Sequence, residues 1–298
     1  MIHTRGLIKR YGSHAALDGV DLHVPAGAVY GLAGPNGAGK TTLLGILAGL
    51  KEATEGQVTV AATPGEVAVL SDTPRFDPWL TGREVVALAL TLSSKGGPGH
   101  SRQDADRVEE VLSQSGLSEA SSRRCGGYSR GMLQRLGIAS TLVARPSLIL
   151  LDEPASALDP QGRREVLDLI ATLRGHATVL FSSHILGDVQ EVCDTVGILH
   201  QGRLLFQGPL VDLLVGHAVP RYVVRVRANA DAIAASLTHA PWVMSATATE
   251  GGVIRVEVAS LDDAERLLPR ALASADASVV SLGPEEVSLE RAFLELTS

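Results

Sequence analysis

The sequence has few cysteines. Among its 298 residues there are two, Cys125 and Cys193, and their spacing matches neither a disulfide pattern nor a metal site. Isolated thiols of this kind are typical of a reducing compartment and are expected to be inert. The first residues, 1–5, also lack the charged and apolar regions of a secretory signal. We therefore expect a protein that stays in the cytoplasm.

Long apolar runs and an excess of basic residues are absent too. The run 85–92 is short and Arg145 interrupts 136–151, whereas a membrane-spanning helix needs about 20 apolar residues. The net charge of −7 gives no electrostatic footprint for nucleic acid. We expect no nucleic-acid partner and no spanning segment. With 45% hydrophobic and 20% charged residues the composition is globular, and the length favours two domains.

A complete phosphate-binding loop, G-x-x-x-x-G-K-[ST], occupies residues 34–41 between an apolar strand and a helical pattern. Glycines let successive backbone N–H groups converge on phosphates, a lysine reaches the β and γ oxygens, and a hydroxyl binds Mg²⁺. The following helix directs its positive end at the anion. The alternative is a glycine-rich turn without a ligand. The candidate ATP-binding residues here are Gly34, Asn36, Gly37, Ala38, Gly39, Lys40, Thr41 and Thr42.

Two adjacent carboxylates end the buried apolar strand 148–152. They are costly to place there unless a cation or a proton acceptor uses them. Asp152 is predicted to orient Mg²⁺ and its waters, together with Thr41. Glu153 is predicted to polarise a water for in-line attack on the γ-phosphate. The alternative is a pair of solvated carboxylates at a strand end.

Three further segments carry candidate residues. Ser129, Gly131 and Met132 open a helix, where a serine and a glycine can form a second anion site. Residues 157–159, which end in Asp159, follow Glu153 closely. His184 ends the next strand, where it is placed to sense a γ-phosphate, although an isolated histidine is often structural.

Residues 1–215 are predicted to form an α/β nucleotide-binding core, with strands near 2–8, 20–24, 57–61 and 67–71. Residues 81–144 read as an inserted helical subdomain, with a mobile Gly/Ser/Pro-rich loop at 93–101. Strand and helix then alternate up to Cys193, which favours a mostly parallel sheet with helices on both faces.

Residues 221–298 have the element order β-α-β-β-α-β, with a Gly251-Gly252 turn between the central strands. This order is that of a small α+β, ferredoxin-like domain. The segment contains no His/Cys cluster, glycine loop or basic patch. We expect a regulatory or interaction domain.

Taken together, these motifs resemble the nucleotide-binding subunit of ABC transporters over residues 1–215. The resemblance implies a P-loop NTPase core in which residues 34–42 are Walker A, 148–152 are Walker B and 128–132 are the signature segment. It also implies that Glu153 is the catalytic glutamate, His184 the switch histidine, 157–159 the D-loop and Tyr11 the aromatic that stacks on adenine; a packed aromatic is the alternative for Tyr11. The C-terminal extension is similar to that of ABC-2, antibiotic and multidrug exporters.

Two departures from the family pattern stand out. The signature reads Tyr-Ser-Arg-Gly-Met where the family usually has Leu-Ser-Gly-Gly-Gln, but Ser129 and Gly131 keep the phosphate-facing groups. Asp72 stands where the family has Gln or Glu to link Mg²⁺ with the membrane partner. Because aspartate is one methylene shorter than glutamate, its contact with the metal can require a bridging water.

The resemblance further implies that ATP lies between the P-loop of one chain and the signature segment of a second, in a dimer that is expected to be a homodimer. Separate integral membrane permease subunits would receive the motion, with this chain on the cytoplasmic face of the membrane. The resulting hypothesis is an ATPase subunit of an exporter of drugs, antibiotics or lipid-like compounds. The alternatives are a soluble ATP switch acting on nucleic acid or ribosomes, and a small-molecule P-loop kinase.

Overall fold

The computed structural model describes residues 1–298 except 94–101, 157, 217–220, 286–287 and 298. The predicted loop at 94–101 and Ala157 therefore lie outside the described residues. The chain divides into two compact units, Met1–Leu213 with Phe293–Ser298, and Leu214–Ala292. No helix in the described ranges combines the length and the apolar character needed to cross a membrane. Cys125 and Cys193 are buried and free, as expected.

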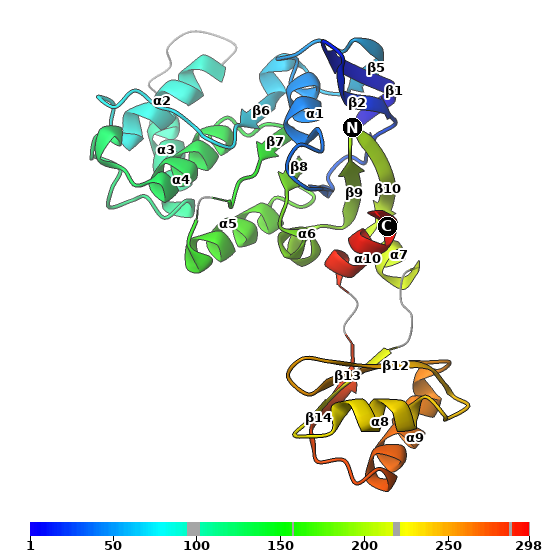
Figure 1. The fold of residues 1–298 in the computed structure, drawn as a ribbon. Coiled ribbons are helices and arrows are strands. Elements are labelled where there is room, and N and C mark those ends of the chain that lie inside the picture. The colour runs from blue at the N-terminus through cyan, green and yellow to red at the C-terminus, as the bar shows by residue number, and fades with distance from the viewer. Residues whose placement is uncertain (94–101, 157, 217–220, 286–287, 298) are drawn as a thin grey trace. The chain divides into compact units, whose positions relative to one another are not determined.

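A six-stranded sheet forms the centre of the first unit (Figure 1). Its strands in spatial order are β10 (Arg203–Pro209), β9 (Thr195–His200), β4 (Val29–Ala33), β8 (Thr178–Ser183), β7 (Leu148–Asp152) and β6 (Val67–Leu70). All neighbours pair in parallel except β10 and β9. Every residue of β4, β7 and β8 is buried, as expected for parallel strands with both faces covered. The predicted mostly parallel sheet is confirmed.

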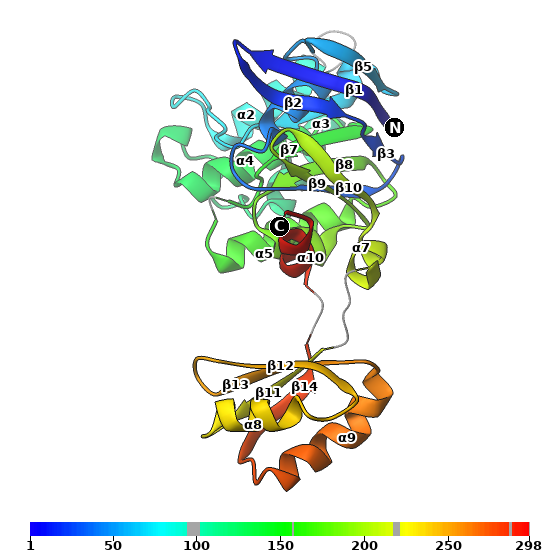
Figure 2. The ribbon, with the colours of Figure 1, turned by 45° about the vertical axis from the view of Figure 1, so that its right-hand side comes forward.

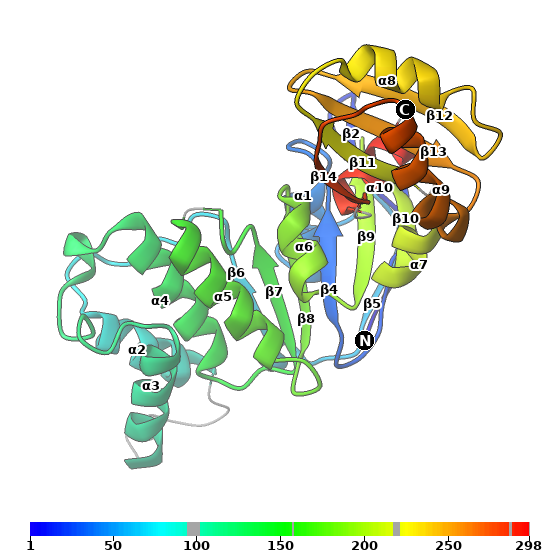
Figure 3. The same ribbon diagram turned by 90° about the horizontal axis from the view of Figure 1, so that it is seen from below.

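Helices cover both faces of this sheet (Figure 3). Helix α1 (Lys40–Leu47) packs on β7, and Tyr30 and Leu32 of β4 share its buried apolar cluster. Helix α6 (Leu186–Val192) packs on β4 and β8. A Cβ at Gly31 would lie 2.4 Å from a side-chain carbon of Val189 on α6. Because the side chains of a strand alternate, the two helices lie on opposite faces of β4.

A second, antiparallel sheet (Figure 2) contacts α1 through its strand β2. It contains β1 (Ile2–Tyr11), β2 (His14–Val20), β3 (His23–Val24) and β5 (Glu55–Val60). The single strand predicted at 20–24 is wrong, because β2 ends at Val20 and β3 begins at His23. The Thr4 hydroxyl accepts the Leu22 N–H at 2.8 Å and donates to the Val20 carbonyl at 2.8 Å. A buried side chain thus replaces a backbone ladder partner at this break.

The predicted helical subdomain consists of α2 (Gly82–Ser93), α3 (Arg102–Gln114) and α4 (Arg130–Leu142). Val108, Val111 and Leu112 form the buried face of α3. Short 3-10 turns occur at Pro64–Glu66 and Cys125–Gly127. Helix α4 packs on β6, where a Cβ at Gly137 would lie 2.4 Å from Leu70. This contact connects the subdomain to the central sheet.

The chain after β7 continues through α5 (Pro160–Thr172), β8 and α6, close to the predicted ranges. Residues 195–216, for which we predicted no element, form β9, β10 and α7 (Leu210–Gly216). The mostly apolar run Val196–Leu199, which the structure buries, was a usable sequence signal for β9. Strand β10 is half-exposed and antiparallel, as befits an edge strand.

The second unit contains β11 (Arg221–Val226), α8 (Ala230–Leu237), β12 (Val243–Thr249), β13 (Val253–Val258), α9 (Leu261–Ser274) and β14 (Val279–Pro284). The strand order is β12-β13-β11-β14, and all pairs are antiparallel. Its core joins alternate residues of β11 and β13 to Ala264 and Leu268 of α9. Gly252 has φ +73°, and a Cβ there would lie 2.4 Å from the Val226 carbonyl oxygen, so the turn requires glycine.

The last helix, α10 (Leu289–Thr297), differs from the predicted division of the chain. We placed all of 221–298 in the second domain, but residues from Phe293 onward group with the first unit. The Phe293 ring meets the His200 ring of β9 edge-on, with centroids 6.2 Å apart and an interplanar angle of 88°. This apolar contact gives the final residues partners in the first unit.

Candidate functional site

The loop between β4 and α1 has a backbone that requires glycine. Gly37 and Gly39 have φ values of 82° and 108°, which side chains disfavour. A Cβ at Gly39 would also lie 2.4 Å from the Ala16 carbonyl oxygen. The loop therefore brings its backbone closely against β2 and leads directly into α1.

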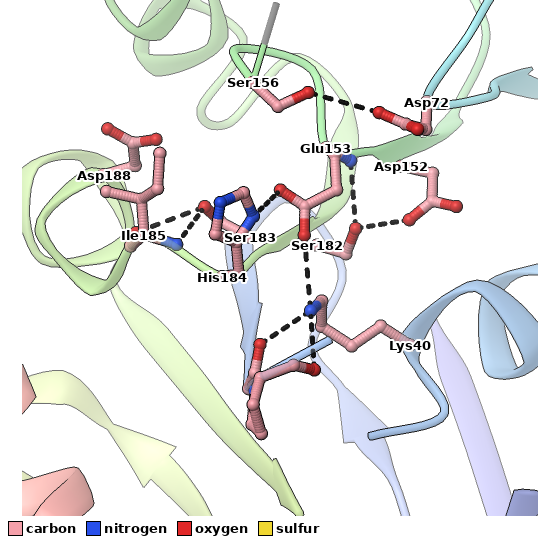
Figure 4. Close-up of polar contacts among 12 residues, drawn as sticks. Lys40, Asp72, Asp152, Glu153, Ser156, Ser182, Ser183, His184, Ile185 and Asp188 are labelled. Atoms are coloured by element: carbon pink, nitrogen blue, oxygen red, sulfur yellow. Dashed lines mark hydrogen bonds and ion pairs between the residues drawn. The ribbon is translucent and has the colours of Figure 1, made fainter. Parts of the chain in front are cut away.

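The Lys40 ammonium, at the start of α1, is almost completely buried (6% exposed). It donates to the carbonyl oxygens of Gly34 at 2.6 Å and Pro35 at 3.2 Å, and it lies 3.3 Å from Glu153 Oε1 (Figure 4). The lysine is thus held over the loop by two carbonyls and one carboxylate. Its charge is directed to the place where the loop amides and the helix end can receive phosphate.

A cavity of about 360 Å³ lies over this loop. Ten of the predicted binding or catalytic residues line it. They are Tyr11, Asn36, Gly37, Ala38, Gly39, Lys40, Thr41, Thr42, Asp72 and Glu153. Tyr11 is 48% exposed, so its ring is available to a ligand rather than packed in the core. The structure therefore brings residues from four separate stretches of sequence to one cavity.

Asp152 and Glu153 are held together by Ser182, whose role the sequence analysis did not identify (Figure 4). The Ser182 hydroxyl is completely buried; it donates to Asp152 Oδ1 at 2.6 Å and accepts the Glu153 N–H at 3.0 Å. Glu153 has φ 49°, an uncommon value for a residue with a side chain. A hydroxyl on β8 thus fixes the backbone and carboxylate at the end of β7.

His184 lies beside the same glutamate (Figure 4). Its Nδ1 is 2.8 Å from Glu153 Oε2, and the side chain is 39% exposed. The neighbouring Ser183 hydroxyl accepts the Ile185 N–H at 3.0 Å, which fixes the turn into α6. Lys40 at the start of α1, Glu153 after β7 and His184 after β8 therefore form a continuous polar chain.

The Arg163 guanidinium donates a hydrogen bond to Asp188 Oδ1 on α6 at 2.5 Å. Burial raises the pKa of Asp188, and the arginine opposes that rise. Since Arg163 belongs to α5, this pair connects the helix after His184 to the helix after Glu153.

Oxygen donors suited to Mg²⁺ lie in the cavity, as Thr41 and Asp72 do, or next to its residue Glu153, as Asp152 does. The Thr41 side chain is exposed, Asp152 ends β7, and Asp72 Oδ1 accepts from the Ser156 hydroxyl at 3.2 Å. In the described ranges, His, Cys, Asp and Glu side chains form no group of three or more that could hold a metal. The donors present fit an ion that keeps most of its ligands as phosphate and water oxygens.

The remaining predicted residues do not line this cavity. Ser129 caps α4, where its hydroxyl accepts the Met132 N–H at 3.2 Å. Asp159 caps α5 by accepting the Gly162 N–H at 2.8 Å. A Cβ at Gly131 would lie 3.1 Å from Leu158, so the two capped helix starts are neighbours. One chain thus carries a phosphate loop and, away from the loop cavity, the neighbouring starts of α4 and α5.

The chain is similar in sequence to known ATP-binding proteins. The family described as ABC transporter matches residues 17–156. An uncharacterized ABC transporter ATP-binding protein of Bacillus subtilis, YxlF, is 41% identical over 72% of both chains. The daunorubicin resistance ATP-binding protein DrrA3 of Streptomyces coeruleorubidus is 31% identical over 98% of this chain and 94% of its own length.

A solved structure agrees with these relatives. The dimeric structure of a bacterial ABC transporter cassette is 25% identical and has a TM-score of 0.66, over 70% of this chain and 99% of that cassette. The P-loop NTPase core predicted from the sequence is confirmed, and the small-molecule kinase alternative is not supported. The chain belongs to the ATP-binding proteins of ABC transporters and is an ATPase.

Proposed function

We propose that this chain powers the export of a drug-like or antibiotic-like compound through separate integral membrane permease subunits, from the cytoplasmic face of the membrane. The observation that carries the proposal is Glu153, which lies in the loop cavity between Lys40 at 3.3 Å and His184 at 2.8 Å. The class of cargo is inferred from the likeness to a daunorubicin resistance protein along almost the whole chain.

In this proposal the residues of the cavity bind ATP. The amides of residues 36–40 and the Lys40 ammonium hold the phosphates, while Tyr11 stacks on the adenine. Thr41 and Asp152 would hold Mg²⁺, and Asp72 would reach it directly or through water. A bound Mg²⁺ neutralises charge on the phosphate oxygens.

Hydrolysis in this proposal depends on Glu153. Its carboxylate accepts a hydrogen bond from the attacking water and orients that water toward the γ-phosphate. His184 holds the carboxylate through Oε2 and is exposed enough to contact the γ-phosphate itself. Ser182 keeps the glutamate backbone in its left-handed conformation. The reaction breaks the bond between the γ-phosphorus and the bridging oxygen and releases ADP and phosphate.

A second ATP-binding subunit, proposed to be an identical chain, completes each site. Ser129, Gly131, Met132 and Asp159 lie outside the loop cavity of their own chain, at helix starts that suit an anion. Ser129, Gly131 and Met132 are proposed to meet the γ-phosphate of the ATP bound by the other subunit, and Asp159 to lie beside them in the same interface. The dimeric cassette to which this chain is similar supports such an assembly.

The C-terminal unit is proposed to be a ferredoxin-like regulatory or interaction domain. Its element order β-α-β-β-α-β and its strand order β12-β13-β11-β14 support that assignment. Among the residues of this unit that the structure describes, none lines the ATP cavity. We therefore assign it to assembly or coupling with the membrane subunits.

The Glu153→Gln variant tests the proposed mechanism. The amide keeps the shape of the side chain but is neutral and too weakly basic to polarise the water, so turnover should fall by about 10²- to 10⁴-fold while ATP still binds. Trapped ATP should produce a dimer in size-exclusion chromatography. Glu191→Gln, at an exposed position on α6, is the matched control and should behave as the parent. A Glu153→Gln protein that hydrolyses ATP at the parent rate would refute the assignment.

A further inference from the structure

Two histidines face each other on neighbouring strands of the antiparallel sheet. His3 of β1 and His23 of β3 are direct partners in the ladder. Their Nδ1 atoms are 3.1 Å apart and their ring centroids 4.3 Å apart. Both side chains are exposed. Neither residue lines the ATP cavity, so the proposed ATPase mechanism leaves this pair without a role.

The separation of the two nitrogens suits chelation. A tetrahedral Zn²⁺ binds imidazole nitrogens at about 2.0–2.1 Å, which places two such nitrogens roughly 3.3 Å apart. Imidazole is a preferred ligand for zinc, copper and nickel ions. The observed 3.1 Å is therefore close to the distance that two ligands of one ion require.

Hydrogen bonds fix the backbone that carries His23. The His23 N–H donates to Gln207 Oε1 at 2.9 Å, and the Gln207 side-chain amide donates to the Asp21 carbonyl at 3.0 Å. The Met1 amino group donates to the Val24 carbonyl at 2.9 Å. These bonds keep β3 next to β1, so the two imidazoles stay at adjacent positions of the ladder.

We propose that His3 and His23 chelate one divalent transition-metal ion, of which Zn²⁺ is the representative, with water in the remaining coordination positions. The ion would fasten the two-residue strand β3 to β1. Binding only to the folded sheet stabilises the folded chain. The same nitrogen separation also fits a hydrogen bond between two neutral rings, in which case no ion would bind at this position.

Calorimetric titration of the full chain with Zn²⁺ decides between these readings, after chelator treatment and without nucleotide. We expect one Zn²⁺ per chain at this site, and an affinity at least tenfold weaker in His3→Asn and in His23→Asn. His176→Asn, at an exposed histidine outside the pair, is the matched control and should bind as the parent. Thermal unfolding in chelator should be the same for all four proteins, which excludes misfolding as the cause.

Zn²⁺ should also raise the Tm of the parent and of His176→Asn but not of either variant of the pair. The proposal is wrong if the parent binds no Zn²⁺, or if either single variant retains the parent affinity. Retention in His23→Asn alone would mean that the ion is held by groups near the chain start without the second histidine.

Discussion

Replacement of Ser182 by alanine tests whether one buried hydroxyl organises the catalytic carboxylates. Ser182 is completely buried, and its oxygen makes two hydrogen bonds, at 2.6 Å to Asp152 Oδ1 and at 3.0 Å from the Glu153 N–H. The Ser182→Ala variant removes both. It leaves β8 paired with β4 and β7, because the hydroxyl takes no part in the backbone ladder.

The two hydrogen bonds of Ser182 determine the expected losses of stability and of kcat. A hydrogen bond to a charged group contributes about 1.5–3 kcal/mol, and a buried N–H left without a partner costs about 1–3 kcal/mol. Together the two terms predict a loss of about 2.5–6 kcal/mol in the free energy of unfolding. If about half of that stabilisation, roughly 1.3–3 kcal/mol, is lost from the catalytic position of the Glu153 carboxylate, kcat falls roughly 10- to 150-fold. The KM for ATP should change little, since Ser182 does not line the cavity.

Urea unfolding and steady-state ATP hydrolysis measure the two quantities separately. Ser140→Ala is the matched control, because the Ser140 hydroxyl donates only to the Leu136 carbonyl within its own helix. That variant should stay within about 0.5 kcal/mol of the parent. A Ser182→Ala protein with parental kcat would show that the two hydrogen bonds do not position Glu153. A rise in KM without a fall in kcat would equally contradict the reasoning.

Three further predictions concern the loop and the end of the chain. Lys40→Ala removes the charge held over the loop, so nucleotide affinity and hydrolysis should fall together, and unchanged binding of a fluorescent ATP analogue would contradict the assigned phosphate site. Gly39→Ala should abolish nucleotide binding, because its Cβ would lie 2.4 Å from the Ala16 carbonyl oxygen. Gly37→Ala, at a positive φ but in open space, should lower the free energy of unfolding by only about 1–2 kcal/mol. The steric argument would be refuted if the two variants had equal effects on nucleotide binding and on stability. Replacement of residues 217–288 by a flexible linker should preserve ATP binding. A chain ending at Gly216 also loses the contact of Phe293 with His200, so its Tm should be lower than that of the linker variant. Equal Tm values for the two proteins would show that this contact contributes nothing.

The sequence by itself determined the parts of this protein that depend on local pattern. The phosphate loop was recognisable because its glycines, Lys40 and Thr41 are adjacent in the chain. The apolar run ending in Asp152 and Glu153 predicted a buried strand with carboxylates at its carboxyl end, and that strand is β7. The order of elements in the second unit followed from alternating apolar residues and the Gly251-Gly252 turn. In each case the signal lies within a few residues.

Only the tertiary structure decided which distant segments meet. The strands predicted at 57–61 and 67–71 looked alike in sequence, yet β5 joins the antiparallel sheet and β6 the parallel one. Ser182 lies 30 positions from Asp152 along the chain, so no local periodicity could predict its two hydrogen bonds. The pairing of His3 with His23 depends on the break between β2 and β3 that Thr4 produces. The return of the chain at Phe293 likewise depends on an aromatic contact with β9. Hydrogen bonds and packing between separate elements arise only when the chain folds, and they are what turned a set of motifs into one cavity.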